Sequence, residues 1–90
     1  MMTIWKYQLM AGDKQTIDMP SGARPLCVQV QNGVPCLWAL CDPSAPKEKR
    51  YFEVFGTGHI VTPGTRDYLG TVQLLDGALV LHVFESEEAP

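Results

Sequence analysis

The pair Asn32-Gly33 joins two apolar-rich segments, residues 25–31 and 34–41, and constrains the fold more than any other feature of the chain. Asn and Gly both tolerate positive φ, so the pair favours a tight turn whose twist matches that of two antiparallel strands. A two-residue loop at this position sets three cross-strand pairs: Gln31 with Val34, Gln29 with Cys36, and Cys27 with Trp38.

The two faces of this hairpin differ in polarity, because successive side chains of a strand point to opposite faces. One face is apolar and is expected to be core: Leu26, Val28, Val30, Pro35, Leu37 and Ala39. The other face mixes polar and aromatic residues: Cys27, Gln29, Gln31, Val34, Cys36 and Trp38. Because the second face is too polar for a core and carries a tryptophan, we expect a ligand or a partner there.

A second hairpin is predicted around Asp76-Gly77, between residues 67–75 and 78–85. Its register places Val72 opposite Leu81, Leu74 opposite Leu79, and Thr71 opposite His82.

The rest of the chain alternates with the period of strands. Residues 3–10, 15–19 and 51–55 are predicted strands, residues 11–13 a turn, and residues 42–50 a polar loop broken by prolines. The chain is therefore expected to be all-β: a small antiparallel sandwich or partly closed barrel of six to seven short strands with two tight hairpins. Residues 1–85 form one domain in this interpretation, and residues 86–90 form an acidic solvated tail.

Charge argues against generic nucleic-acid binding. The chain has ten acidic and seven basic residues, and Glu85, Glu87 and Glu88 account for three of the acidic ones. Residues 1–83 therefore carry seven of each sign, and such a neutral body lacks the cationic field that phosphate backbones require. The start of the chain shows no charged leader followed by an apolar run, and no apolar stretch reaches membrane-spanning length. We expect an intracellular protein without a membrane contact.

The cysteines and histidines indicate neither a metal nor a cofactor. Three cysteines is an odd number, and their spacing matches no zinc or redox pattern, so they are expected to be reduced. His59 and His82 have no further ligand at a helpful spacing. No catalytic residue is assigned, although a small hydrolase that uses Cys36 or His59 stays open as an alternative.

A phosphate site is predicted at Gly56-Thr57-Gly58-His59. The glycines allow backbone N–H groups to approach an anion closely, and a hydroxyl and an imidazole complete the pocket. Arg50 and Arg66 lie on either side in the sequence and could add bidentate contacts. The competing interpretation is that Gly56 and Gly58 only end a strand.

A second candidate site is Trp38 with Gln29 and Gln31, an indole beside two amides. Stacking on the indole and hydrogen bonds from the amides suit a nucleobase or another planar ring. The alternative is a tryptophan packed on the second sheet or in a subunit interface.

A set of ordered motifs covers nearly the whole chain. They are Trp5-Lys6, Val28-Gln-Val-Gln-Asn-Gly-Val-Pro-Cys-Leu-Trp-Ala-Leu40, Asp42-Pro43, Phe55-Gly-Thr-Gly-His59, Asp67-Tyr-Leu-Gly-Thr71 and His82-Val-Phe-Glu85. In these motifs the chain resembles a family of small uncharacterised proteins of tailed bacteriophages and prophages. The resemblance implies a phage accessory protein in the host bacterial cytoplasm, and it carries over no site residues.

The hypothesis that follows is a non-enzymatic binding protein that counters host antiviral defence by sequestering a small phosphorylated, nucleotide-type signal. The alternative is a protein-interaction module that inhibits a host defence protein or serves as a minor virion or assembly protein. A homo-oligomer is expected in either case, because a sheet domain of this size leaves exposed edges.

Overall fold

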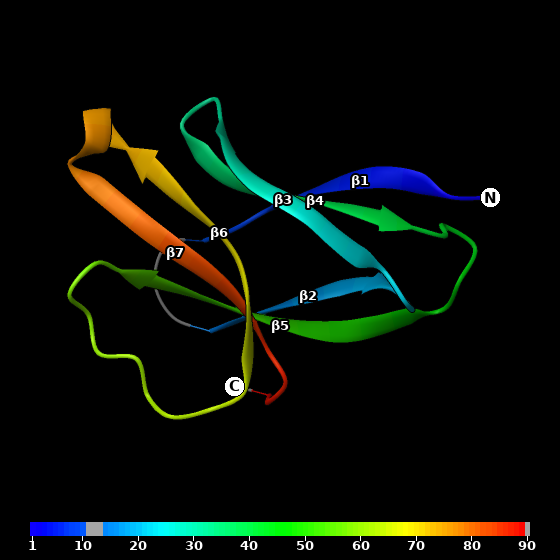
Figure 1. The fold of residues 1–90 in the computed structure, drawn as a ribbon. Helices are drawn as coiled ribbons and strands as arrows, with labels where there is room; N and C mark the ends of the chain where they lie inside the picture. Colours follow the sequence, from blue (N-terminus) through cyan, green and yellow to red (C-terminus); the bar gives the residue numbers. More distant parts are fainter. Residues whose placement is uncertain (11–13, 90) are drawn as a thin grey trace.

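The computed structural model describes residues 1–10 and 14–89, and these residues form seven strands in two antiparallel sheets packed face to face (Figure 1). The strands are β1 (Thr3–Gln8), β2 (Gln15–Pro20), β3 (Arg24–Gln31), β4 (Val34–Cys41), β5 (Lys47–Gly56), β6 (Arg66–Leu74) and β7 (Leu79–Ser86). A short 3₁₀ turn, Leu75–Gly77, lies between β6 and β7. The all-β prediction is confirmed, as a sandwich and not as a closed barrel.

The three-stranded sheet has the order β1-β4-β3, and the four-stranded sheet has the order β2-β5-β7-β6. The chain changes sheet after β1, after β2 and after β4, so each sheet combines segments that are distant in the sequence. The turn predicted for residues 11–13 lies outside the described residues.

The core fills the space between the sheets. In β4 the side chains of Leu37, Ala39 and Cys41 are fully buried against the four-stranded sheet, which contributes Phe52 and Val83. Burying one large apolar side chain such as Phe52 stabilises the fold by roughly 2–3 kcal/mol. The neighbours of these β4 residues along the strand point to the opposite, outer face of the three-stranded sheet.

Both predicted hairpins are present with the predicted registers. Gln31 pairs with Val34 and Cys27 pairs with Trp38, and in the second hairpin Thr71 pairs with His82. The first turn has φ of 52° at Asn32 and 76° at Gly33, as the sequence requires. In the second turn Asp76 and Gly77 also have positive φ, and the Ala78 N–H donates to the Leu75 carbonyl oxygen at 3.0 Å.

Three expectations about the core and the strands were wrong. Leu26 was expected in the core, but it is the extra residue of a β-bulge between Pro25 and Cys27, and its side chain is exposed. Val30 is also exposed, because it lies at the end of the hairpin where the four-stranded sheet covers it incompletely. The segment 47–50 was expected in a loop, but it begins β5, where it pairs with residues 17–20 of β2.

The last strand extends further than expected. β7 ends at Ser86, whose side chain is buried and whose hydroxyl accepts a hydrogen bond from the Glu88 N–H at 3.1 Å. Within the described ranges no helical segment has the length and apolar character needed to cross a bilayer.

Leu75 has a strained backbone. Its φ is 53°, in the left-handed region, and its side chain is 75% exposed. An L-residue in this region costs about 1 kcal/mol, and asparagine tolerates the conformation better. We predict that Leu75→Asn raises the free energy of unfolding by about 1 kcal/mol, or the Tm by roughly 4–8 °C, in a thermal unfolding measurement.

The matched control is Leu75→Ala, which removes the exposed side chain and keeps the Cβ that causes the strain. This variant should unfold close to the wild-type temperature. An equal gain in both variants would show that the exposed side chain, not the backbone, is the source of the instability.

Candidate functional site

The outer face of the three-stranded sheet is built from cross-strand rows centred on β4. Lys6 of β1, Trp38 of β4 and Cys27 of β3 form one row, because Lys6 pairs with Trp38 and Trp38 pairs with Cys27. On one side of this row lie Ile4, Leu40 and Arg24, and on the other lie Gln8, Cys36 and Gln29. This set of residues is called the Trp38 face below.

The Trp38 face contains a shallow hollow of about 310 Å³, lined by Ile4, Leu26, Cys27, Gln29 and Trp38. The bulge in β3 creates it, because the extra residue turns Leu26 away from the core toward Trp38. Without the bulge Leu26 would point inward, as the sequence pattern predicts. The lining is mainly apolar, with the Gln29 amide as a polar group at its edge.

A cation and an amide are linked across this face. The Lys6 Nζ donates a hydrogen bond of 2.7 Å to Gln31 Oε1, although the two residues belong to the outer strands β1 and β3. The Lys6 side chain therefore passes over β4. Cys36, which lies on this face between the rows of Trp38 and Val34, is only 1% exposed. Gln29 and Gln31 do lie on the same face as Trp38, as predicted.

Charge is distributed unequally between the two sheets. Strands β1, β3 and β4 contain no aspartate or glutamate, and their charged residues are Lys6 and Arg24, both exposed on the Trp38 face. The net charge of the chain is −3, so setting aside these two positive charges leaves −5 for the remainder. The Trp38 face is thus a cationic surface on an acidic protein.

The Gly56–His59 segment forms a tight turn at the end of β5. The His59 N–H donates to the Gly56 carbonyl oxygen at 3.1 Å, and the His59 ring occupies the space where a Cβ of residue 56 would lie. The Thr57 hydroxyl is hydrogen-bonded to His82 Nε2 at 2.7 Å. Of the two glycines, Gly58 has a positive φ of 85°, and Gly56 leaves room for the His59 ring.

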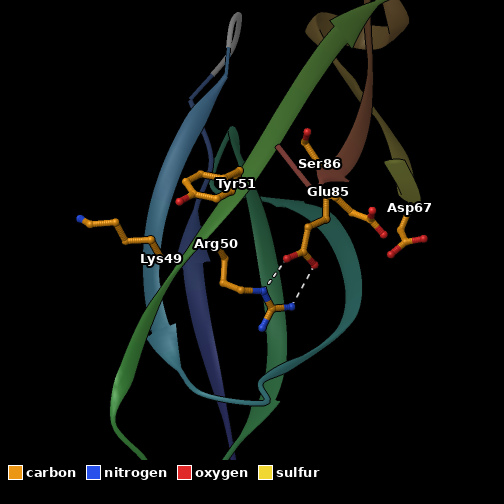
Figure 2. A pocket seen from close by; sticks show the side chains of 7 residues that line it. Lys49, Arg50, Tyr51, Asp67, Glu85 and Ser86 are labelled. Carbon is orange, nitrogen blue, oxygen red and sulfur yellow. Dashed lines mark hydrogen bonds and ion pairs between the residues drawn. The ribbon is translucent and has the colours of Figure 1, made fainter. Parts of the chain in front are cut away.

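Arg50 is held by Glu85. Figure 2 shows the Arg50 guanidinium pointing at the Glu85 carboxylate, and Arg50 Nη2 donates to Glu85 Oε1 at 2.9 Å. Arg50 Nη1 also donates to the Ala23 carbonyl oxygen at 2.8 Å. These hydrogen bonds raise the pKa of the Arg50 guanidinium above its ordinary value, chiefly through Glu85.

A hollow of about 350 Å³ lies beside this ion pair (Figure 2). It is lined by Lys49, Arg50, Tyr51, Asp67, Glu85, Ser86 and Glu87. Three of its side chains are carboxylates, so it does not offer the cationic surroundings that a phosphate needs.

Arg66 is bound in the same manner by Glu53. Its Nε donates to Glu53 Oε1 at 3.1 Å and its Nη2 to Glu53 Oε2 at 3.2 Å, while Nη1 donates to the Thr62 carbonyl oxygen at 2.6 Å. The Arg66 and Glu53 side chains are 9% and 5% exposed. Neither predicted phosphate-binding arginine therefore presents a free guanidinium.

The two predicted sites lie far apart within one chain. Trp38 lies on the outer face of the three-stranded sheet, whereas His82, the partner of Thr57, lies on the outer face of the four-stranded sheet between the core residues Leu81 and Val83. The whole core separates the two groups. Within one chain the two candidate sites are therefore separate, with Gly56, Thr57, Gly58 and His59 on one side of the core and Trp38 on the other.

The described part of the chain offers no metal site, since no group of three or more His, Cys, Asp or Glu side chains there is placed to hold an ion. All three cysteines are free thiols, and Cys36 and Cys41 are buried.

Sequence reasoning missed five residues of the Trp38 face, which are Ile4, Lys6, Gln8, Arg24 and Leu40, and it also missed Leu26 in the hollow. The first three come from β1, whose pairing with β4 has no local sequence signal. Arg24 and Leu26 lie at the bulge. The absence of acidic residues from residues 24–41 was visible in the sequence and could have drawn attention to this sheet.

The Glu53–Arg66 pair is predicted to be structural. Glu53→Gln leaves the Arg66 charge buried without its partner, which should lower the free energy of unfolding by about 3 kcal/mol in urea denaturation.

The control is the double variant Glu53→Leu/Arg66→Met, which removes both charges and should recover most of that loss. If Glu53→Gln were as stable as the wild type, Arg66 would not depend on Glu53 and would be free to bind an anion.

Comparison with known proteins gives a match to one protein family. The search of curated proteins and the search of solved structures each find no significant similarity. Residues 1–90, the whole chain, match a family described as a domain of unknown function, DUF7352. The chain thus belongs to the DUF7352 family.

Proposed function

We propose that the protein binds a small anionic ligand with a planar ring, of nucleotide type, on the Trp38 face. The observation that carries the proposal is the coincidence, on one sheet surface, of an indole, two amides and two cations without any carboxylate from its strands. The phosphate contacts are thereby assigned to Lys6 and Arg24, in place of Arg50 and Arg66.

Each group has a distinct role in this proposal. The Trp38 indole stacks on the planar ring, an interaction worth roughly 1–3 kcal/mol per base. The Gln29 amide at the edge of the hollow orients the ring by hydrogen bonding, and Lys6 and Arg24 neutralise the phosphate. Because Lys6 also contacts Gln31, the ammonium group is held close to the sheet surface.

The size of the hollow supports a single ring. A volume of about 310 Å³ is near the lower limit of ligand pockets, and it accommodates one base better than a longer ligand. In the phage setting implied by the sequence resemblance, such a protein would sequester a nucleotide signal of host defence in the bacterial cytoplasm.

A second function is favoured by a different observation. Ile4 is 55% and Leu26 44% exposed at the rim of the hollow. Exposed apolar side chains around a tryptophan are also typical of protein interfaces. In this alternative the Trp38 face docks on a host or virion protein, or on a second copy of the chain, and no small molecule binds.

Thermal unfolding with a panel of adenosine and guanosine phosphates, ADP-ribose and cyclic dinucleotides tests the first proposal. A ligand at 100 times its Kd stabilises the native state by about 2.7 kcal/mol, which corresponds to a Tm shift of roughly 10–20 °C for a domain of this size. We expect a shift with at least one class. No shift across the panel would overturn the proposal in favour of a protein partner.

Variants locate the site once a compound binds. Trp38→Ala should weaken binding by roughly 5- to 150-fold, the equivalent of the stacking energy. Lys6→Gln and Arg24→Gln should each weaken it less and reduce its salt dependence. The matched control is Lys49→Gln, an exposed lysine of the four-stranded sheet, which should bind like the wild type. If Trp38→Ala binds the compound with wild-type affinity, the binding site does not lie on the Trp38 face.

A further inference from the structure

A chain of hydroxyl groups and one imidazole runs across the outer face of the four-stranded sheet. The Thr57 hydroxyl lies 2.7 Å from His82 Nε2, and His82 Nδ1 lies 3.0 Å from the Thr71 hydroxyl. The Thr71 hydroxyl in turn lies 2.5 Å from the Tyr68 hydroxyl. None of the four side chains in this hydrogen-bonded series is a carboxylate, a lysine or an arginine.

A neutral imidazole allows two consistent sets of donors, because each hydroxyl in the series can donate or accept. In the set that a general base requires, Thr57 donates its proton to Nε2, and the N–H at Nδ1 donates to Thr71, which donates to Tyr68. This is the arrangement of a nucleophile, a base and a residue that orients the base. Thr71 fixes the orientation of the His82 ring, and Tyr68 holds the Thr71 hydroxyl in place.

The position of Thr57 supports the same interpretation. It follows β5 in a tight turn between Gly56 and Gly58, and it is exposed to solvent. Gly58 has φ of 85° with open space around its Cα. Among the described residues the Gly58 N–H has no hydrogen-bond acceptor. A free N–H on the residue after a nucleophile is a common donor to the oxyanion of an acyl-transfer reaction.

We propose that Thr57 is a nucleophile that accepts acyl groups from small uncharged carboxylic esters, with His82 as its general base. The Thr57 oxygen attacks the ester carbonyl carbon while His82 Nε2 takes the hydroxyl proton. The ester C–O bond then breaks, and the leaving alkoxide receives that proton and departs as an alcohol. Water attacks the acyl-Thr57 ester in the second half-reaction, which releases the carboxylic acid and restores the threonine.

The absence of charged groups from this hydrogen-bonded series determines the class of substrate and the rate of deacylation. A phosphorylated substrate would find no cation in this group of side chains, whereas an uncharged ester needs none. Thr71 lacks the negative charge with which an aspartate stabilises an imidazolium. Deacylation is therefore expected to be slow, and the acyl-protein should accumulate.

The experiment uses the full chain with p-nitrophenyl acetate. We expect a burst of p-nitrophenolate that approaches one equivalent, and peptide mass spectrometry should place one acetyl group on Thr57. Thr57→Val should abolish the burst, and Thr57→Ser should retain it. The control is Thr16→Val, an exposed strand threonine in β2, which should behave like the wild type.

His82→Phe tests the base. General base catalysis is worth about 100-fold or more, so the burst rate should fall by at least that factor while thermal unfolding shows a folded protein. If His82→Phe does not fold, Thr57→Val carries the test alone, because it removes only the hydroxyl. Acetylation confined to lysines, or an unchanged burst in Thr57→Val, would overturn the proposal. Neither result would affect the Trp38 face on the opposite side of the core.

Discussion

The close approach of β3 to β6 is the constraint on which the rest of the structure depends. Among the described residues these two strands make the most extensive contact between the sheets, and at its centre Gly70 lies against Val28. A Cβ at residue 70 would be 3.4 Å from the Val28 Cβ, which is van der Waals contact, so the two strands pack directly against each other there. Each of the two strands is interrupted by a bulge beside this contact, at Leu26 in β3 and at Leu69 in β6.

The two bulges determine what each outer face presents. In β3 the extra residue turns Leu26 outward, and with Trp38 it lines the hollow on the three-stranded sheet. In β6 the extra residue brings Tyr68 and Thr71 onto the same face, although residues three apart in a regular strand point to opposite faces. The hydrogen bond between Tyr68 and Thr71, and so the chain that ends at Thr57, depends on that shift.

Local signals in the sequence were sufficient for the hairpins and insufficient for the sites. Asn32-Gly33 and Asp76-Gly77 specify their turns by backbone preference alone, so the pairing of Trp38 with Cys27 and of Thr71 with His82 follows from counting along the chain. The ion pairs of the arginines, in contrast, could not be predicted from local signals. Arg50 binds Glu85, 35 residues away, and Arg66 binds Glu53, 13 residues away, and neither pairing has a local signal. Two cations that flank a glycine-rich turn in the sequence therefore resembled a phosphate site, while in the fold each is neutralised by its own carboxylate.

The same ion pairs explain why carboxylates occur in the four-stranded sheet and not in the strands of the three-stranded sheet. Glu53 and Arg66 lie on the outer face of the four-stranded sheet, where an unpaired charge would be costly among the rings of Phe55 and Phe84. Carboxylates are thereby required in that sheet to balance its arginines. Lys6 and Arg24 lie in a sheet whose strands contain no carboxylate, so nothing within those strands neutralises them. Cations that a fold leaves without a carboxylate, beside an aromatic ring at the surface, are available to a partner that brings its own negative charge.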